Sequence, residues 1–309
     1  MKRSLITGIV GALAIFGIAC SSGENRDNPT RGTIRIASDE SFQPVIEALT
    51  SAYENIYPRT NFEVVYLPEQ KAILSLLTDS VRMVFVTRTL SSEEDEMIHR
   101  QASTAKTHHI ATDAIALITS QQNAGTKITI NELERIFKGE ITNWDQLAES
   151  SRTGVINLVF DDANSSNLIY LSSFFNISDF TGLRISVAGS HQKVVDHVKE
   201  NPSSIGFIGM SWISDGKELA TQELAENLYV IGIGNDTLNT EYYYPFQEDL
   251  ESRKYPLARE LYAITREAHS GLGGGLLTYI ARDVGGLIIT KMGLVPKVPY
   301  PRDVILKTE

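Results

Sequence analysis

The chain has 309 residues, of which 42% are apolar and 21% charged, a globular composition long enough for two modest lobes. Its net charge of −10 argues against a nucleic-acid partner, because such binders cluster Lys and Arg to neutralise phosphates. Cys20 is the only cysteine, which excludes internal disulfides and cysteine-rich metal sites, and the 6 scattered histidines offer little for a His-based metal centre.

The N-terminus has the composition of an export signal. Two basic residues precede an apolar run over residues 5–18, which is short for a membrane span. The small residues before Cys20 resemble a bacterial lipobox, although Gly17 stands where Leu is usual. A non-cleaved signal anchor is the alternative. We expect a lipoprotein signal peptide over 1–19, a lipidated Cys20 and a flexible tether over 20–31.

Strand-like and helix-like segments alternate after the tether, which favours an α/β fold with largely parallel sheets. Alternating or β-branched runs predict strands at 33–37, 61–66, 81–87, 110–119, 155–160, 204–208, 228–233 and 257–265. Apolar residues at helical spacing predict helices at 42–56, 71–77, 168–175, 191–199 and 276–292, the last interrupted at Gly285-Gly286.

Two further helices are predicted from their first residues. Ser91 or Ser92, followed by Glu94, forms a capping box at one of them. Thr129 with Glu132 forms a second capping box before a helix that runs through Phe137.

Three polar turns, 38–41, 87–92 and 164–166, each join the end of a strand to the start of a helix. Ligands of open α/β sheets bind beyond the carboxyl ends of strands, and helix N-termini bind anions through unpaired N–H groups. Hydroxyl groups add neutral donors, and Arg88 is the one cation in these turns, able to clasp an oxyanion bidentately. The alternative is that each turn is only a helix N-cap. Convergence on one cleft would distinguish the two.

Enzymatic signatures are incomplete. The segment 209–212 begins like a nucleophile elbow, but Ile213 replaces the final Gly. The segment 271–275 begins like a dinucleotide loop, but Leu276 replaces the last Gly, so we expect a flexible turn there. We therefore expect no enzymatic activity, no metal and no cofactor.

Taken in order, several segments resemble the PstS-like group of type II periplasmic binding proteins, which are the solute-binding proteins of phosphate ABC importers. The likeness runs over nearly all of residues 32–302. It rests on Val86-Thr87-Arg88-Thr89-Leu90-Ser91 with Glu93, on 130–144, on 204–209, on 255–259 and on 293–296. The segment 130–144, with Ile136-Phe137, Gly139, Ile141 and Trp144, is the most specific.

The resemblance implies a two-lobed type II periplasmic-binding-protein fold of the α/β class, with two hinge crossovers and a ligand trapped by closure. Lobe one would comprise 32–112 plus 236–309, and lobe two 113–235. The implied ligand is phosphate or a related small oxyanion, and the implied partners are the permease subunits of an ABC transporter. We expect a monomer, exported and lipid-anchored to a bacterial membrane on its periplasmic side or at the cell surface.

The resemblance also implies the ligand-binding residues, which are Ser38, Asp39, Glu40, Ser41, Thr87, Arg88, Asp162, Asn164, Ser165 and Ser166. Two positions depart from the family. Phe160 stands in place of a phosphate-clasping Arg, and the loss of such a clasp predicts an affinity lower by about one to two decades. The turn 67–70 replaces a Gly-Ser-rich one and places the Glu69 carboxylate nearby.

These observations favour a lipid-anchored solute-binding protein for phosphate or a related oxyanion. The alternative is the same fold with altered specificity, acting as a sensor or a surface interaction module. A phosphoester hydrolase ranks last, because the sequence lacks a metal cluster and an activated nucleophile.

Overall fold

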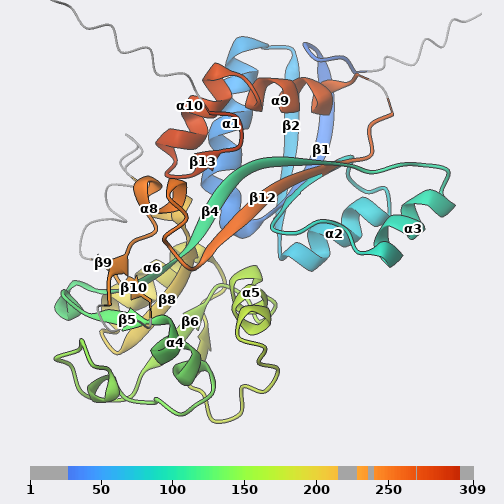
Figure 1. Ribbon diagram of the computed structural model, residues 1–309. Helices are drawn as coiled ribbons and strands as arrows, with labels where there is room; N and C mark the ends of the chain where they lie inside the picture. The colour runs from blue at the N-terminus through green and yellow to red at the C-terminus, as the bar shows by residue number, and fades with distance from the viewer. Residues whose placement is uncertain (1–26, 215–227, 236–239, 269, 300–309) are drawn as a thin grey trace, which may run out of the picture.

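The computed structural model describes residues 27–214, 228–235, 240–268 and 270–299 (Figure 1). The predicted signal peptide and Cys20 lie outside these residues. The described part of the chain is α/β, as expected, with helices on the faces of a long, curled sheet.

The larger sheet has ten strands. Its main path runs β2 (Thr60–Leu67), β1 (Gly32–Asp39), β3 (Met83–Val86), β12 (Ala258–Thr265), β4 (Lys106–Ser120), β8 (Ser204–Gly209), β6 (Asn157–Phe160), β7 (Ile185–Val187). Two short strands, β9 (Leu228–Val230) and β13 (Val295–Pro296), also pair with β4. A second sheet contains β11 (Tyr242–Tyr243), β10 (Gly232–Gly234) and β5 (Lys127–Thr129).

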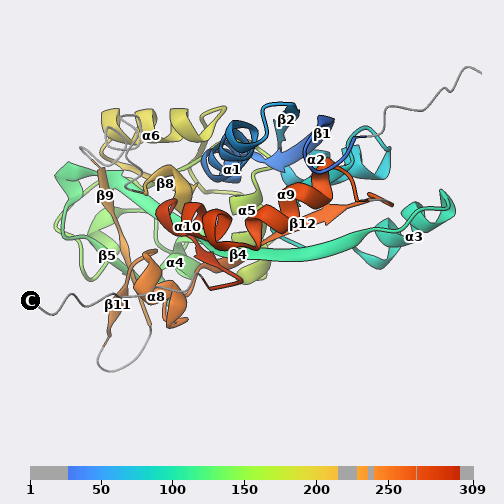
Figure 2. The same cartoon turned by 90° about the horizontal axis from the view of Figure 1, so that it is seen from above.

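The strands β4 and β12 link two halves of the molecule. The first half contains β1, β2 and β3, and the second half contains β6, β7 and β8. The strands at each end of the large sheet are parallel, β1 with β2 and β3, and β6 with β7 and β8. In the middle, β12 is antiparallel to β3 and β4, and β4 is antiparallel to β8. The predicted parallel arrangement is therefore correct at the ends and wrong in the middle. Figure 2 shows β4 running from one half to the other.

The helices cover both halves. They are α1 (Gln43–Ile56), α2 (Glu69–Leu77), α3 (Ser92–Arg100), α4 (Ile130–Phe137), α5 (Ser166–Phe174), α6 (His191–Glu200), α8 (Gln247–Glu251), α9 (Leu272–Ile280) and α10 (Asp283–Lys291). In the first half, α1, α9 and α10 lie on one face of the sheet and α2 and α3 on the other (Figure 1). In the second half, α6 packs on β4, β6 and β8.

The hydrophobic core changes along the linking strands. On β4, Ala111 packs with the core of the first half and Ala114 with that of the second. Along the segment that leads into β12 and continues through it, Leu257 packs with the second core and Leu261 with the first. We retain the two-lobe division as a proposal, with lobe two at 113–257. The boundary predicted at 236 moves, because Leu250 and Leu257 fill the second core.

Two capping boxes form as predicted. Ser91 caps α3 and Thr129 caps α4, and in each the third helical residue, Glu94 or Glu132, accepts a hydrogen bond from the backbone of the cap. These local signals fix where the helices begin.

The flexible turn predicted over 271–275 is instead the start of α9. The Glu267 carboxylate accepts hydrogen bonds from the backbone N–H groups of Gly273 (3.1 Å) and Gly274 (2.8 Å), which fixes the first turn. A Cβ at Gly275 would lie 2.9 Å from the Cα of Pro29, so glycine here permits a close approach.

The last predicted helix breaks at Ala281–Arg282 rather than at Gly285-Gly286. A Cβ at Gly285 would lie 2.5 Å from the Tyr279 carbonyl oxygen, so glycine permits the close approach of the two helices at the break. Within the described ranges, no single helix is long and apolar enough to cross a membrane. Together α9 and α10 reach that length, with a bend of 68° between them.

The end of the predicted tether is ordered. Asp27 accepts hydrogen bonds from the backbone N–H of Leu272 (2.6 Å) and from Nη1 of Arg82 (2.7 Å). The hydroxyl of Tyr53 donates to the carbonyl of Pro29. The prediction of an unstructured segment is therefore wrong for residues 27–31, which dock on α1 and α9.

Candidate functional site

Two of the three polar turns meet between the halves. The Asp39 carboxylate accepts hydrogen bonds from the Ser41 backbone N–H (3.0 Å), from the Ser41 hydroxyl and from the Ser166 hydroxyl (2.9 Å). Asp39 ends β1 in the first half, whereas Ser166 opens α5 in the second. All three side chains are buried, so the halves are closed on each other at this point.

Three further predicted residues of these turns, Ser38, Asn164 and Ser165, make hydrogen bonds to residues close to them in the chain. The Ser38 hydroxyl donates to the carbonyl of Asp39 (2.9 Å). The Ser165 hydroxyl donates to Asp161 (2.5 Å), and the Asn164 backbone N–H donates to Asp162 (2.8 Å). Asn164 is exposed on the turn, whereas Ser38 and Ser165 are buried beside the meeting point.

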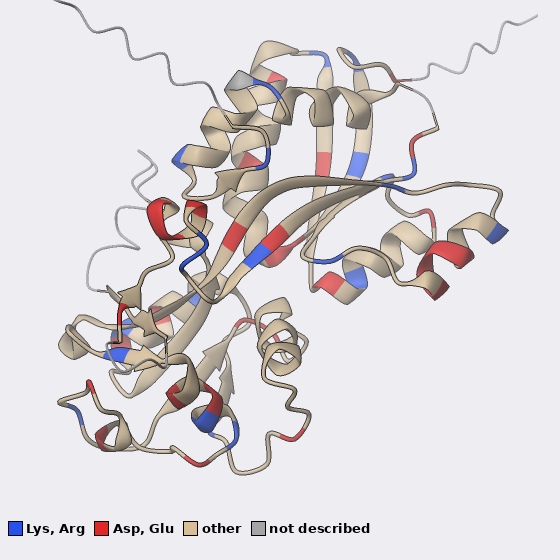
Figure 3. Cartoon of the chain, in the orientation of Figure 1, with Lys and Arg blue, Asp and Glu red and all other residues tan. Residues whose placement is uncertain are grey.

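An ion pair between Arg259 on β12 and Asp113 on β4 lies behind Ser166. The Arg259 Nε donates to Asp113 (2.9 Å), and Nη1 donates to Asn167 (2.7 Å) and approaches the Ser166 hydroxyl (3.4 Å). The ring of Phe42 lies under the guanidinium, 5.1 Å from it. Both charged side chains are almost fully buried, and Figure 3 shows the basic segment of β12 beside the acidic segment of β4.

Sequence reasoning missed Arg259 as a site residue. The signal was available, because Arg259 shares one face of the predicted strand with the apolar residues Leu261 and Ala263, and a charged residue on such a face must be paired or functional. The Nη2 atom of Arg259 lies 2.9 Å from an Asp113 oxygen, but neither of the N–H bonds of Nη2 points at that oxygen. Nη2 therefore has no hydrogen-bond partner in the described structure. A buried guanidinium nitrogen with an unused donor is a group that an oxyanion would satisfy.

The segment after β8 closes the site from the second half. The Trp212 Nε1–H (3.1 Å) and the Ser211 hydroxyl (3.4 Å) donate to the carbonyl of Ser41. Gly209 permits this approach, because a Cβ there would lie 2.7 Å from the same carbonyl oxygen and 3.4 Å from Nη2 of Arg259.

Glu40 supplies a second carboxylate that reaches from the first half to the second. It accepts a hydrogen bond from the backbone N–H of His191, the first residue of α6. Burial, together with the nearby charges of Asp161, Asp39 and Asp162, raises the pKa of Glu40 to about 7. Glu40 is thus a half-buried carboxyl that holds a proton at neutral pH about as often as not.

His191 is buried beside this cluster. Its Nε2 lies 3.7 Å from an Asp161 oxygen, and its ring lies 5.4 Å from that of Trp212. Burial lowers the pKa of His191, although the Asp161 charge opposes that effect. The junction between the halves therefore gathers more carboxylates than cations.

The third turn forms an adjoining cluster. The Glu69 carboxylate accepts hydrogen bonds from the Thr87 backbone N–H (2.6 Å) and hydroxyl (2.5 Å). The Arg88 guanidinium is bidentate to Glu94 (2.8 and 2.9 Å), and its Nε lies 3.5 Å from Glu69. Arg88 is therefore held by the chain's own carboxylates. Burial raises the pKa of Glu69, and the nearby charge of Asp39 adds to that rise.

Phe160 does not line the cleft. Its ring stacks on Phe207, 4.6 Å between centroids, and packs edge-on against Phe137 in the second core. Phe160 therefore neither binds a ligand nor blocks a binding site.

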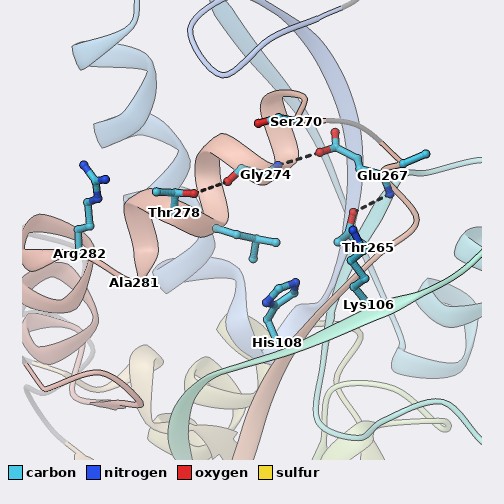
Figure 4. A pocket seen from close by; sticks show the side chains of 11 residues that line it. Lys106, His108, Thr265, Glu267, Ser270, Gly274, Thr278, Ala281 and Arg282 are labelled. Carbon is cyan, nitrogen blue, oxygen red and sulfur yellow. Dashed lines mark hydrogen bonds between the residues drawn. The ribbon is translucent and has the colours of Figure 1, made fainter.

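A depression of about 690 Å³ lies elsewhere, between the start of β4 and α9 (Figure 4). Lys106 and His108 line one side, and Glu267 lies with its carboxylate on the first turn of α9 (Figure 4). None of its lining residues belongs to the three turns. Among the described residues no group of three or more His, Cys, Asp and Glu is arranged to hold a metal ion.

Comparison with known proteins agrees with this architecture. Residues 23–284 match the family model described as the PBP superfamily domain. The chain belongs to the PBP superfamily. The chain is similar to the phosphate-binding protein PstS of Borreliella burgdorferi, with 25% identity over 253 residues that cover 80% of this chain and 82% of that one. A second relative, PstS of Bacillus subtilis, is 19% identical over 299 residues, covering 93% and 92%.

Solved structures share the fold of this PBP superfamily member. A phosphate ABC transporter substrate-binding protein from Clostridium perfringens, solved with bound phosphate, superposes with a TM-score of 0.70 at 20% identity, covering 86% of this chain and 99% of that one. An ABC-type phosphate transport receptor from Vibrio cholerae gives 0.63 at 18% identity, covering 85% and 99%. The two-lobed binding-protein fold predicted from the sequence is confirmed.

Proposed function

We propose that this protein captures phosphate or a related small oxyanion in the closed cleft and delivers it to an ABC importer. The observation that best supports this proposal is the buried junction of Asp39, Ser41 and Ser166. It lies beside the Nη2 atom of Arg259, which has no hydrogen-bond partner. Donors from both halves face one place there. The names of the relatives, which are phosphate-binding and phosphate-transport proteins, support the same ligand.

The proposed ligand site differs from the predicted one in its cation. Arg259 takes the role first given to Arg88, because Arg88 is already bidentate to Glu94. Ser41, Ser166 and the start of α5 would supply neutral donors. Because carboxylates are abundant, an oxyanion that still carries a proton would fit best, its O–H donating to Asp39 or Glu40.

Binding is tested by calorimetry and thermal melting with phosphate, and with sulfate for comparison. Phosphate at about 100 times its Kd should stabilise the protein by about 2.7 kcal/mol. Ser166→Ala should weaken phosphate binding about ten-fold, whereas Ser173→Ala, an exposed serine on the same helix, should leave it unchanged. No response at millimolar phosphate would refute the proposal.

A second function, a sensor or surface interaction module that closes without ligand, is favoured by one observation. Asp39 and Glu69 already satisfy donors that an oxyanion would use. A closed conformation that persists without phosphate, with no binding in calorimetry, would support this role.

The remaining parts of the proposal follow from the sequence. We propose a monomer without enzymatic activity, exported by the signal over 1–19 and held to a membrane through Cys20. Labelling with a lipid precursor, compared between the natural chain and Cys20→Ser, tests the anchor.

A further inference from the structure

Glu69 occupies a place with the chemistry of an anion subsite, where the ends of β2 and β3 flank the end of β1. It opens α2 directly after Pro68, and its side chain is almost fully buried. One carboxylate oxygen accepts both donors of Thr87, the backbone N–H at 2.6 Å and the hydroxyl at 2.5 Å. A backbone N–H and a hydroxyl that converge on one oxygen are the groups that bind an oxyanion oxygen.

The charge of Glu69 is poorly compensated. Arg88 approaches it at 3.5 Å, but the two Nη atoms of Arg88 bind Glu94. The neighbouring Asp39 carboxylate repels it. The two hydrogen bonds from Thr87 are the closest interactions that stabilise this buried carboxylate.

We propose that Glu69 is an internal anion that occupies the Thr87 subsite and thereby sets the affinity of the cleft for external oxyanions. This inference rests on the proposed function. An incoming oxyanion loses the Thr87 donors to Glu69 and meets an extra negative charge. Glu69 is therefore a specificity-determining residue that disfavours the more highly charged anions.

The test compares phosphate affinity, measured by calorimetry at pH 7, in the unaltered protein and in two variants. Glu69→Ala removes the charge and frees both Thr87 donors, so the affinity should rise at least ten-fold. Glu69→Gln removes only the charge and keeps an oxygen that accepts from Thr87, so its gain should be smaller. Glu96→Ala, the same charge change at an exposed position on α3, should leave the affinity unchanged.

The outcomes separate the two proposals. A purely structural role for Glu69 would make both substitutions weaken binding, so reduced or unchanged affinity in folded Glu69 variants overturns the inference alone. Binding by Glu69→Ala but not by the unaltered protein supports the inference and overturns the proposed function. Absence of phosphate binding in every variant overturns both.

Discussion

At the scale of single residues, Asp39 is the centre of the site. Its carboxylate accepts hydrogen bonds from both halves, so in the closed structure it stands where part of a bound anion would be expected. A ligand must either displace this carboxylate from Ser166 or donate a proton to it. The second route favours ligands that carry an ionisable O–H group.

Arg259 should be required for both stability and binding. Arg259→Ala leaves Asp113 buried without its cation, which costs about 3–5 kcal/mol of unfolding free energy. Phosphate binding should be lost as well. Urea denaturation measures the first effect and calorimetry the second.

The double variant Arg259→Met with Asp113→Leu separates these effects. Replacing a buried ion pair by apolar residues of similar size is often neutral, so most of the stability should return. Binding should not return. A double variant that binds phosphate as tightly as the unaltered protein would remove Arg259 from the site.

Glu40 should make stability depend on pH. Its pKa in the closed structure, about 7, is above the ordinary value of 4.5, so the protonated form is favoured by folding. The contribution is fully present below about pH 4.5 and is lost as the pH rises through 7. Because the side chain is half-exposed, solvent weakens the effect of its surroundings. We expect the free energy of unfolding to fall by about 1–2 kcal/mol over this pH range.

The measurement compares thermal melting of the natural protein with that of Glu40→Gln, which mimics the protonated side chain. The variant should gain stability relative to the natural protein between pH 5 and 8. Glu96→Gln, an exposed glutamate, should show no such trend. Equal pH profiles for all three proteins would mean that Glu40 keeps an ordinary pKa.

At the scale of elements, the sequence predicted those whose signals are local. The capping boxes at Ser91 and Thr129 place the starts of α3 and α4, because the cap and its partner lie within four residues. The likeness to a known family predicted the overall arrangement.

Features that depend on distant partners were not predicted. Pro29, far away in the chain, packs against the glycine-rich 271–275 segment at the start of α9, whereas Glu267 lies nearby but outside the spacing of a capping box. The Arg259–Asp113 pair joins residues far apart in the chain, and the capture of Thr87 by Glu69 depends on the pairing of β1 with β2 and β3. Spacing along the sequence shows none of these contacts.

At the scale of the whole molecule, closure depends on contacts that concentrate on one loop. Ser166, His191 and Trp212 of the second half all reach residues 39–41 of the first. The halves are also joined by β4 and β12 and by Gln247, whose side-chain amide donates to the backbone carbonyls of Thr290 and Leu294. Small changes at that loop should therefore shift the balance between open and closed forms.

Gly209→Ala should oppose closure. The added Cβ would lie 2.7 Å from the Ser41 carbonyl oxygen, while the φ of −70° suits alanine, so the effect comes from the contact alone. Small-angle scattering should show a larger radius of gyration, and phosphate affinity should fall at least ten-fold. Gly274→Ala, with an ordinary contact of 3.7 Å, serves as the control. An unchanged radius and affinity in Gly209→Ala would contradict the closed arrangement.

The docked N-terminal segment has a mechanical consequence. Residues 27–31 are fastened to α1 and α9, at the end of the first half that is remote from the cleft (Figure 1). Any pull that arrives along the chain from upstream of Asp27 is thus borne by the first half alone. We expect the second half to receive that load only through its connections with the first half.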